Sequence, residues 1–219
     1  MRKLIGAIAV ALVAGSVSAP TAGAGGQATV NVLHGIPGVE VEVCVDGMSV
    51  VDGFRFKQKI VGAALPAGEH EVTLVAAEAS CEDPAILDKT VSLEAGENYT
   101  VVAALHEDGS ARLRLFRNPL GPTREERARL TVRHTAQAPA VNVWANGEVL
   151  IGGDGFTWGK RATFGVPAGT YRVKVTLPGE RRAVIGPVDL TLRAGRAYQV
   201  FAIGELGRYA LAVLSTRVG

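Results

Sequence analysis

An internal repeat of about 100 residues limits what this chain can fold into more than any other feature. Residues 41–47 (VEVCVDG) match residues 141–147 (VNVWANG) at an offset of 100. Self-similarity at a fixed period indicates repeated structural units. We therefore expect one unit over 27–118 and a second over 128–218. Further blocks match in the same order along both halves: His34 with His134, 52–54 with 154–156, 65–68 with 166–169, and 93–99 with 192–198.

The strand pattern within each repeat has a period of two. Valines at every second position from 39 to 45 alternate with polar residues and a cysteine, which predicts a half-buried strand. The strand ends at Asp46-Gly47, or Asn146-Gly147 in the second copy, and both pairs suit a tight hairpin turn. Short strands separated by Gly, Pro and Asp predict an all-β fold of two tandem antiparallel, immunoglobulin-like sandwiches. The other expected strands are 71–76, 90–93, 99–105 and 112–116.

The junction between the repeats is short and contains two prolines. Residues 119–127 are expected to form a stiff linker. The one helix-like stretch is 123–130, where Thr123 and Glu126 have the spacing of a helix capping box. One or two helical turns are expected there.

Tyr99 and Tyr198 each follow a Leu-x-Ala-Gly turn and enter an apolar strand. This arrangement is typical of the tyrosine corner, in which the phenolic hydroxyl binds the backbone a few residues upstream. We expect a structural role for both tyrosines.

The first 24 residues have the pattern of a secretory signal peptide. Arg2 and Lys3 precede an apolar run over 4–17, and small residues occupy 22–24. Cleavage is expected after Ala24. Because no later stretch is long and apolar enough to span a bilayer, we expect a secreted protein, either released or held at the cell surface by non-covalent contacts.

The first repeat carries a recognisable set of motifs. These are His34-Gly35-Ile36-Pro37-Gly38, the strand at 41–47, the turn at Phe54, the loop 65–68 and the corner at 96–99. Together they resemble the bacterial secreted family known as domain of unknown function 4397. The second repeat departs from the pattern at 135–139 and has Trp144 in place of Cys44. The resemblance implies an exported sandwich module that often occurs in tandem, and it implies no activity or site residues.

The two cysteines, Cys44 and Cys81, are expected to form a disulfide because the chain is exported. The alternation of the first strand places Cys44 on its outer face with Glu40 and Glu42. Cys81 lies in the loop 78–84. The bridge would therefore hold this loop over the outer face of the sheet.

The charge is balanced overall but divided between the repeats. Of 23 Lys and Arg, Arg2 and Lys3 lie in the signal, which leaves 21 against 21 Asp and Glu. No net basic field attracts nucleic acid or an anionic membrane. Residues 25–118 carry 7 basic against 14 acidic side chains, and residues 119–219 carry 14 against 7. Two hypotheses follow: the acidic unit docks on the basic one, within a chain or between chains, or the basic unit faces an acidic polymer of the cell envelope.

Exposed aromatic residues of the second repeat are the candidate binding residues. Trp144 is expected to point away from the core, where it could stack on a sugar or anchor a protein. Alternatively, the loop 178–186 covers it, with the stem of Arg181 or Arg182 on the indole. Phe156 and Trp158 form a second candidate pair in a glycine-rich loop, where packing at the sandwich end competes with binding.

Motifs for catalysis and metal binding are missing from the sequence. It has no Gly-x-Ser-x-Gly elbow, His-Glu-x-x-His helix or phosphate-binding glycine loop after the signal, and no histidine has a second ligand at short spacing. We expect no cofactor and no enzymatic activity. The leading prediction is an extracellular or cell-surface interaction module with a cell-envelope polymer or protein as partner. The alternative is a carbohydrate- or cell-wall-binding module that uses Trp and Arg of the second repeat.

Overall fold

The computed structural model describes residues 26–153 and 155–218, and all regular structure within these ranges is β-strand. The predicted signal peptide lies outside the described residues. The first repeat forms eight strands: β1 (Gln27–His34), β2 (Glu40–Val45), β3 (Met48–Arg55), β4 (Lys59–Pro66), β5 (Gly68–Ala76), β6 (Leu87–Leu93), β7 (Asn98–Leu105) and β8 (Ala111–Arg117). The second forms β9 (Arg127–His134), β10 (Asn142–Ala145), β11 (Glu148–Ile151), β12 (Arg161–Pro167), β13 (Gly169–Thr176), β14 (Ala183–Leu192), β15 (Arg196–Ile203) and β16 (Ala210–Arg217).

Each repeat is a sandwich of two four-stranded sheets. In the first sandwich, sheet A has the order β4-β1-β7-β8 and sheet B the order β3-β2-β5-β6. In the second, sheet C has the order β12-β9-β15-β16 and sheet D the order β11-β10-β13-β14. A separate apolar core fills each sandwich. The predicted all-β fold of two tandem sandwiches is thereby confirmed.

One strand pair in each sandwich departs from the expected antiparallel arrangement. β1 pairs with β7 in parallel, and β9 pairs with β15 in parallel, whereas all other pairs are antiparallel. Parallel neighbours need a long crossover between them. That crossover contains the strands of sheet B in the first repeat and of sheet D in the second, which come between the two paired strands in the sequence.

The hairpin turns after β2 and β10 form as predicted. Asp46 and Gly47 have φ angles of 51° and 75°, and Asn146 and Gly147 have φ angles of 51° and 88°. Positive φ at both central residues is the requirement of a tight two-residue hairpin.

The helical turns predicted at 123–130 are wrong. The linker contains no helix, and β9 already begins at Arg127 and pairs with β12 and β15. The apolar residues Ala128, Leu130 and Val132 alternate toward the core with period two. Their burial in a sheet outweighs a capping signature at the start of a helix too short to be stable alone.

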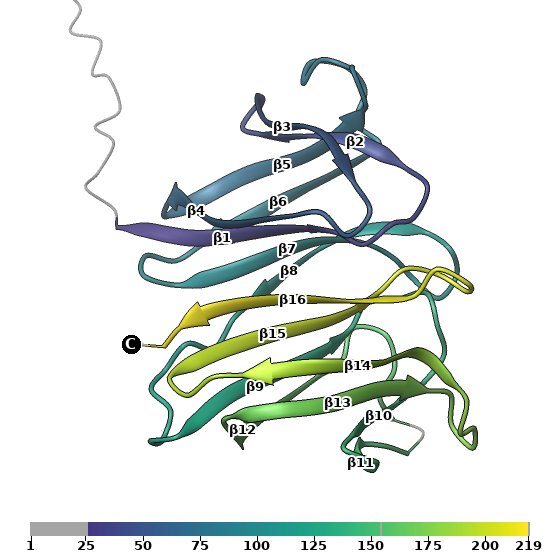
Figure 1. Ribbon diagram of the computed structural model, residues 1–219. Coiled ribbons are helices and arrows are strands. Elements are labelled where there is room, and N and C mark those ends of the chain that lie inside the picture. Colours follow the sequence, from purple (N-terminus) through teal and green to yellow (C-terminus); the bar gives the residue numbers. More distant parts are fainter. Residues whose placement is uncertain (1–25, 154, 219) are drawn as a thin grey trace, which may run out of the picture.

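The two sandwiches are stacked face to face, so that four sheets lie in the order B, A, C, D (Figure 1). Sheets A and C meet along an apolar seam between the sandwiches. Consequently β7 is buried on both faces except at Leu105, which explains its unbroken apolar run. The seam residues are Leu33, Val102, Ala104, Phe201, Ile203, Ala212 and Leu214, flanked by Phe56, Phe116 and Ala210.

The hypothesis that the acidic unit docks on the basic unit through opposite charges is wrong for contacts within one chain. The sandwiches do pack together, but through apolar faces. Within residues 26–153 and 155–218, none of the ion pairs joins one sandwich to the other. In the described part of the chain, therefore, ion pairs do not hold the two sandwiches together.

Candidate functional site

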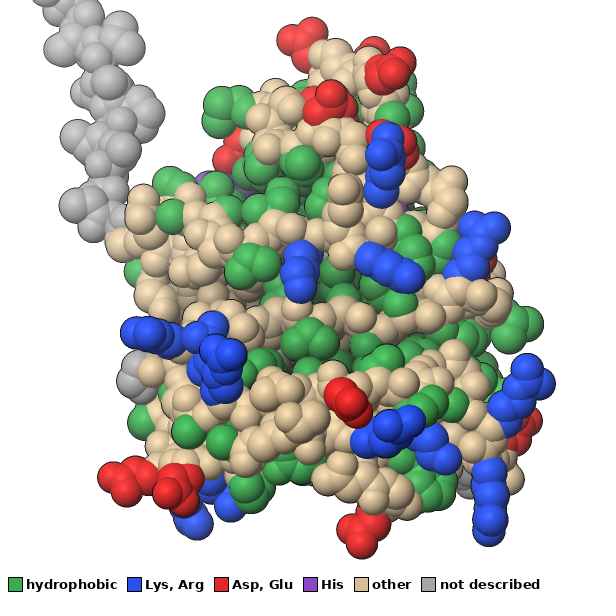
Figure 2. Space-filling view, in the orientation of Figure 1, with side chains coloured by type: hydrophobic (Ala, Val, Ile, Leu, Met, Phe, Trp, Pro, Cys, Tyr) green, Lys and Arg blue, Asp and Glu red, His purple; other side chains and the backbone are tan. Residues whose placement is uncertain are grey.

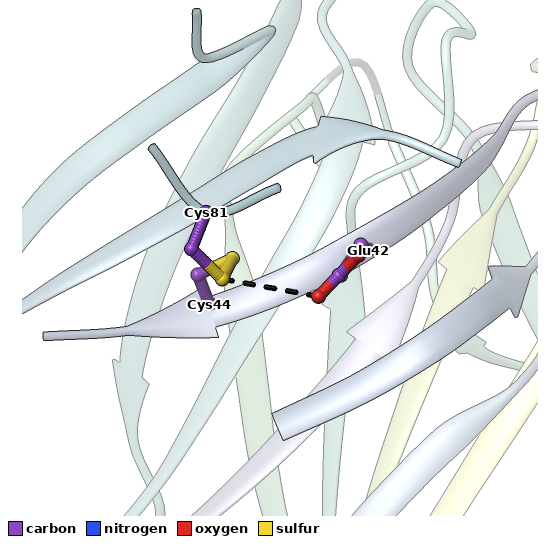
Figure 3. Close-up of side chains that lie close together, drawn as sticks. All are labelled: Glu42, Cys44 and Cys81. Carbon is purple, nitrogen blue, oxygen red and sulfur yellow. Dashed lines mark hydrogen bonds between the residues drawn. A yellow bond between two sulfur atoms is a disulfide. The ribbon is translucent and has the colours of Figure 1, made fainter. Parts of the chain in front are cut away.

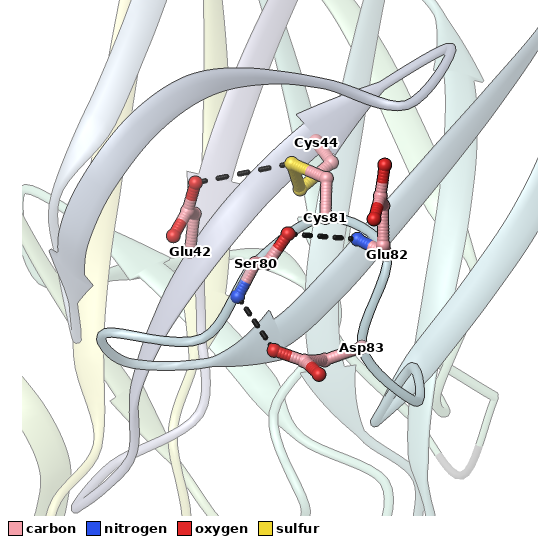
Figure 4. Close-up of a disulfide and its surroundings, with 6 residues drawn as sticks. All are labelled: Glu42, Cys44, Ser80, Cys81, Glu82 and Asp83. Carbon is pink, nitrogen blue, oxygen red and sulfur yellow. Dashed lines mark hydrogen bonds between the residues drawn. A yellow bond between two sulfur atoms is a disulfide. The ribbon is translucent and has the colours of Figure 1, made fainter.

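The structure brings Cys44 and Cys81 together at the pairing that the sequence predicts. Cys44 lies one residue before the end of β2, and Cys81 lies in the loop 77–86 between β5 and β6 (Figure 4). The two sulfur atoms are 2.03 Å apart. Hydrogen bonds from Ser80 N to Asp83 Oδ2 (2.8 Å) and from Glu82 N to Ser80 Oγ (3.2 Å) shape the loop. Cys44 is fully buried because the loop covers the outer face of sheet B.

Glu42 lies beside this bridge on the same strand, and its Oε1 is 3.8 Å from Cys81 Sγ (Figure 3). The carboxylate and both sulfur atoms lie within 4.8 Å of one another, which is a spacing that metal ligands can have. Metals bind the thiolate form of cysteine, however, and a disulfide has no thiolate. The arrangement is a cross-link with a carboxylate beside it.

Both predicted tyrosine corners have the expected geometry. The hydroxyl of Tyr99 accepts a hydrogen bond from Glu94 N (3.2 Å), and that of Tyr198 accepts one from Arg193 N (2.9 Å). Both rings are buried. These tyrosines fix the turns before β7 and β15.

The matched histidines pack on matched phenylalanines. The ring centroids of His34 and Phe54 are 5.7 Å apart, and those of His134 and Phe156 are 6.2 Å apart. Burial lowers the pKa of His34 to about 4 and also lowers the pKa of His134. Phe156 is therefore part of a buried structural pair, and the hypothesis of an exposed binding residue at this position is wrong.

Trp158 extends from the second sandwich onto the first. Its Nε1 donates a hydrogen bond to Leu105 O (2.9 Å), and its ring meets His106 edge-on at 4.5 Å between centroids. The guanidinium of Arg114 lies 5.2 Å from the indole centroid. Half-buried in this way, Trp158 joins the two sandwiches and is not a free binding surface.

Phe56 makes the reciprocal contact, at the position of the first repeat that matches Trp158. It packs against Gly204, where the hairpin between β15 and β16 begins. Gly204 N donates to Gly35 O across the seam (3.1 Å), and its φ is +95°. A side chain on Gly204 would come within 2.3 Å of Arg208 O. Each repeat thus places one aromatic residue on the other, a contact that the sequence analysis missed although both rings stand two residues after a matched Asp-Gly-Phe block.

Trp144 lies on the outer face of sheet D and is half-buried. Its Nε1 donates to Thr176 Oγ1 (3.0 Å), and Lys174 Nζ lies 4.7 Å from the ring centroid. Lys174 therefore takes the place expected for the stem of Arg181 or Arg182, both of which are exposed. The loop 177–182 is shorter than predicted because β14 already begins at Ala183.

The two sandwiches differ in how their charges are paired. In the first, Arg55 binds Glu40 (2.8 Å), Arg112 binds Asp108 (3.1 Å) and Arg117 binds Glu97 (2.5 Å). In the described part of the second, no Lys or Arg forms an ion pair. On the face drawn in Figure 2, acidic side chains gather at the end formed by sheet B and also stand at the lower edge, and basic ones are spread over the middle and lower parts.

Arginines without ion pairs gather beside the linker. β9 places Arg127 and Arg129 on the face of sheet C opposite the core, and the linker residue Arg124 and Arg161 of β12 lie nearby. We call this region the linker groove and define it by these four arginines. It contains a hollow of about 410 Å³ lined by Arg124, Arg127 and Arg129, and a second of about 390 Å³ lined by Arg161 and residues 117–121. The charge excess of this repeat can be counted in the sequence, but its location on the surface cannot.

Arg133 continues the same row into the seam. It is fully buried between Phe116 and Phe201, and its Nη2 donates to Arg117 O (2.9 Å). The Nε of Arg133 has no hydrogen-bond partner among the described residues. In the strand register, Arg133 of β9 lies opposite Arg161 of β12. Burial, together with the charge of Arg161, lowers the pKa of Arg133 to about 10.

The paired sheets, the two tyrosine corners and the seam define a tandem β-sandwich protein with immunoglobulin-like units. In the described ranges no helix is long and apolar enough to cross a membrane. The family model of the domain of unknown function DUF4397 matches residues 28–144 and again residues 136–218. The chain therefore belongs to this family, and the two matches agree with two tandem copies. No curated protein matches the chain.

Proposed function

We propose that this chain is a non-enzymatic, exported interaction protein whose second sandwich binds an acidic partner of the cell envelope. The observation that carries the proposal is the difference in charge pairing. The first sandwich uses arginines in ion pairs, whereas the second has 14 basic side chains and none in an ion pair among its described residues. Unpaired basic side chains on a rigid fold supply an attractive field for a polyanion.

The seam supports a role as a rigid platform. Apolar packing and the contacts of Phe56 and Trp158 hold the sandwiches in one arrangement. A binding surface that is already ordered loses little entropy when its partner arrives. The signal-like pattern over residues 1–24 supports a location outside the cell.

The buried polar residues support a non-enzymatic role. The hydroxyls of Tyr99 and Tyr198 are hydrogen-bonded to backbone amides, and His34 accepts a hydrogen bond from Ile36 N (3.2 Å). These groups stabilise turns within each repeat. Catalytic groups, by contrast, are expected in a cleft where a reacting atom can approach a nucleophile and a base.

The alternative, a module that stacks a sugar on exposed aromatic rings, now depends on one residue. Phe156 is buried and Trp158 lies in the seam, which leaves Trp144. Lys174 lies over the ring of Trp144. Charge therefore supports the proposal better than stacking does.

Co-sedimentation with insoluble cell-wall and acidic polysaccharide preparations tests the proposal. We expect retention at low salt, loss of retention at about 0.5 M salt because screening shortens the reach of the charges, and no difference for Trp144→Ala. Retention that survives salt but fails in Trp144→Ala would support the stacking alternative. An absence of retention at low salt would contradict both.

A further inference from the structure

We propose that the linker groove is the binding site for a carboxylate-bearing polysaccharide, a chain of uronic acid residues. The inference rests on the proposed function and assigns it to Arg124, Arg127, Arg129 and Arg161. Among the described residues, Glu97 lines the two hollows along with these arginines, and both of its oxygens are already used by Arg117, at 2.8 and 2.5 Å. Glu125 and Glu126 are exposed on the linker between Arg124 and Arg127. Four arginines against these two glutamates leave the groove a local excess of positive charge.

A like-charge contact at one end of the groove points to an anion. Arg161 and Arg133 lie directly opposite each other on β12 and β9, and neither forms an ion pair with a residue of 26–153 or 155–218. Like charges at opposed positions of a sheet are destabilising. Arg133 is also fully buried, with an unpartnered Nε. A carboxylate bound to Arg161 would offset this repulsion.

The middle of the groove is organised before any ligand arrives. Arg129 donates to Pro122 O (3.2 Å) and to Gly121 O, and Arg127 donates to Gly165 O. These bonds fix the planes of the guanidinium groups and leave further N–H donors free, because each guanidinium has five. Arginine matches the geometry of a carboxylate with two parallel hydrogen bonds.

The spacing of the arginines favours a chain over a small anion. Arg129 of β9 lies opposite Gly165 of β12, and Gly165 is four residues from Arg161 on the same strand. The positions of Arg129 and Arg161 are therefore about 13 Å apart along the strand direction. Charges spread over this length match repeating carboxylates. Thr123 and Thr163 line the same hollow. The Thr123 hydroxyl donates to Arg127 O (3.2 Å) and that of Thr163 is hydrogen-bonded to Thr131 Oγ1 (3.2 Å), so each can still accept a hydrogen bond from a sugar hydroxyl.

The test is calorimetric titration of residues 25–219 with a hexamer of galacturonic acid. The groove variant is Arg124→Gln with Arg161→Gln, because these side chains are exposed and make no hydrogen bond that shapes the linker. The matched control is Arg172→Gln with Arg208→Gln, which removes the same charge from exposed positions of β13 and of the hairpin between β15 and β16. A neutral maltohexaose and a short polyphosphate serve as control ligands. Thermal unfolding shows whether each variant is folded.

We expect the groove variant to bind the uronate hexamer at least about tenfold more weakly, since two charge-assisted contacts are lost, and the control variant to stay within about twofold. Equal weakening in both variants, unchanged binding in the groove variant, or tighter binding of polyphosphate than of uronate would overturn the assignment. If the wild type sediments with acidic polysaccharide and the groove variant does so equally, the function stands and the site is wrong. If the wild type is not retained, the function itself fails.

Discussion

Equivalent positions of the two repeats carry different residues where their surroundings differ. Position 33 of the first repeat holds a leucine in the seam, and the matching position holds the buried Arg133. Cys44 is covered by its cross-linked loop, whereas Trp144 is half-buried with Lys174 beside its ring. The sequence shows that these residues differ but not why, because the reason lies in the neighbouring layer.

The seam contact of Trp158 gives a residue-scale prediction. Trp158→Ala should lower the free energy of unfolding by about 2 to 3 kcal/mol, less than for a fully buried tryptophan, because the ring is half-buried. Trp158→Phe keeps a ring and loses the hydrogen bond to Leu105 O, so a loss of about 1 kcal/mol is expected. Denaturant unfolding measures both. Trp158→Ala as stable as the wild type would mean that the ring does not join the sandwiches.

His34 gives a pH prediction. Its pKa is lowered from 6.5 to about 4 by burial, so the unfolded chain binds a proton at a higher pH than the folded chain. Stability therefore falls as the pH drops from 6.5 toward 4, by about 2 kcal/mol between pH 7 and pH 5 from this residue. His134 acts in the same direction, and the raised pKa of His70 acts against it.

Comparing His34→Gln with the wild type isolates this contribution. Urea unfolding at pH 7 and pH 5 should show a smaller pH dependence in the variant. An NMR titration of the wild type that gave His34 an ordinary pKa near 6.5 would contradict the prediction.

At the scale of elements, strands with a clear apolar pattern could be predicted, and largely exposed strands could not. β2, β5, β6, β7 and β8 lie within a few residues of the expected strands, although β6 and β8 are edge strands. β3 and β4 were not expected, because they carry mixed, largely exposed residues that give no apolar pattern. The predicted helix at 123–130 does not form, because the pairing of β9 with β12 and β15 outweighs the local capping signature.

The loop 77–86 gives a prediction at this scale. Loss of the bridge between Cys44 and Cys81, which closes 37 residues of chain, should lower the free energy of unfolding by about 3 to 4 kcal/mol. Unfolding with and without reductant measures the loss, and reduction should also expose the loop to limited proteolysis. Two free thiols in a non-reducing mass measurement would show that the protein lacks the bridge.

At the scale of the whole molecule, the apolar seam makes the two sandwiches one body. The seam residues come from both repeats. The linker is short, because β8 ends at Arg117 and β9 begins at Arg127. Apolar packing is not screened by salt, unlike contact between opposite charges.

We therefore expect a single unfolding transition whose midpoint changes little between about 0.05 and 1 M sodium chloride. Small-angle scattering should give the same radius of gyration at both concentrations. Two separate transitions, or an expansion at high salt, would mean that charge holds the sandwiches together after all. Because sodium chloride is expected to release an acidic partner, the same experiment separates cohesion within the chain from binding.

The sequence by itself determined the number of repeats, the β class, the hairpin turns, the tyrosine corners and the pairing of Cys44 with Cys81. The first four depend on residues close in the chain or on a pattern that occurs in both repeats, and the cysteine pairing follows because the chain has only two cysteines. Only the tertiary structure decided that Trp158 and Phe56 cross the seam, that Phe156 is buried, and that unpaired arginines line the linker. Those outcomes depend on which sheet faces meet, and the energy of that meeting comes from residues far apart in sequence.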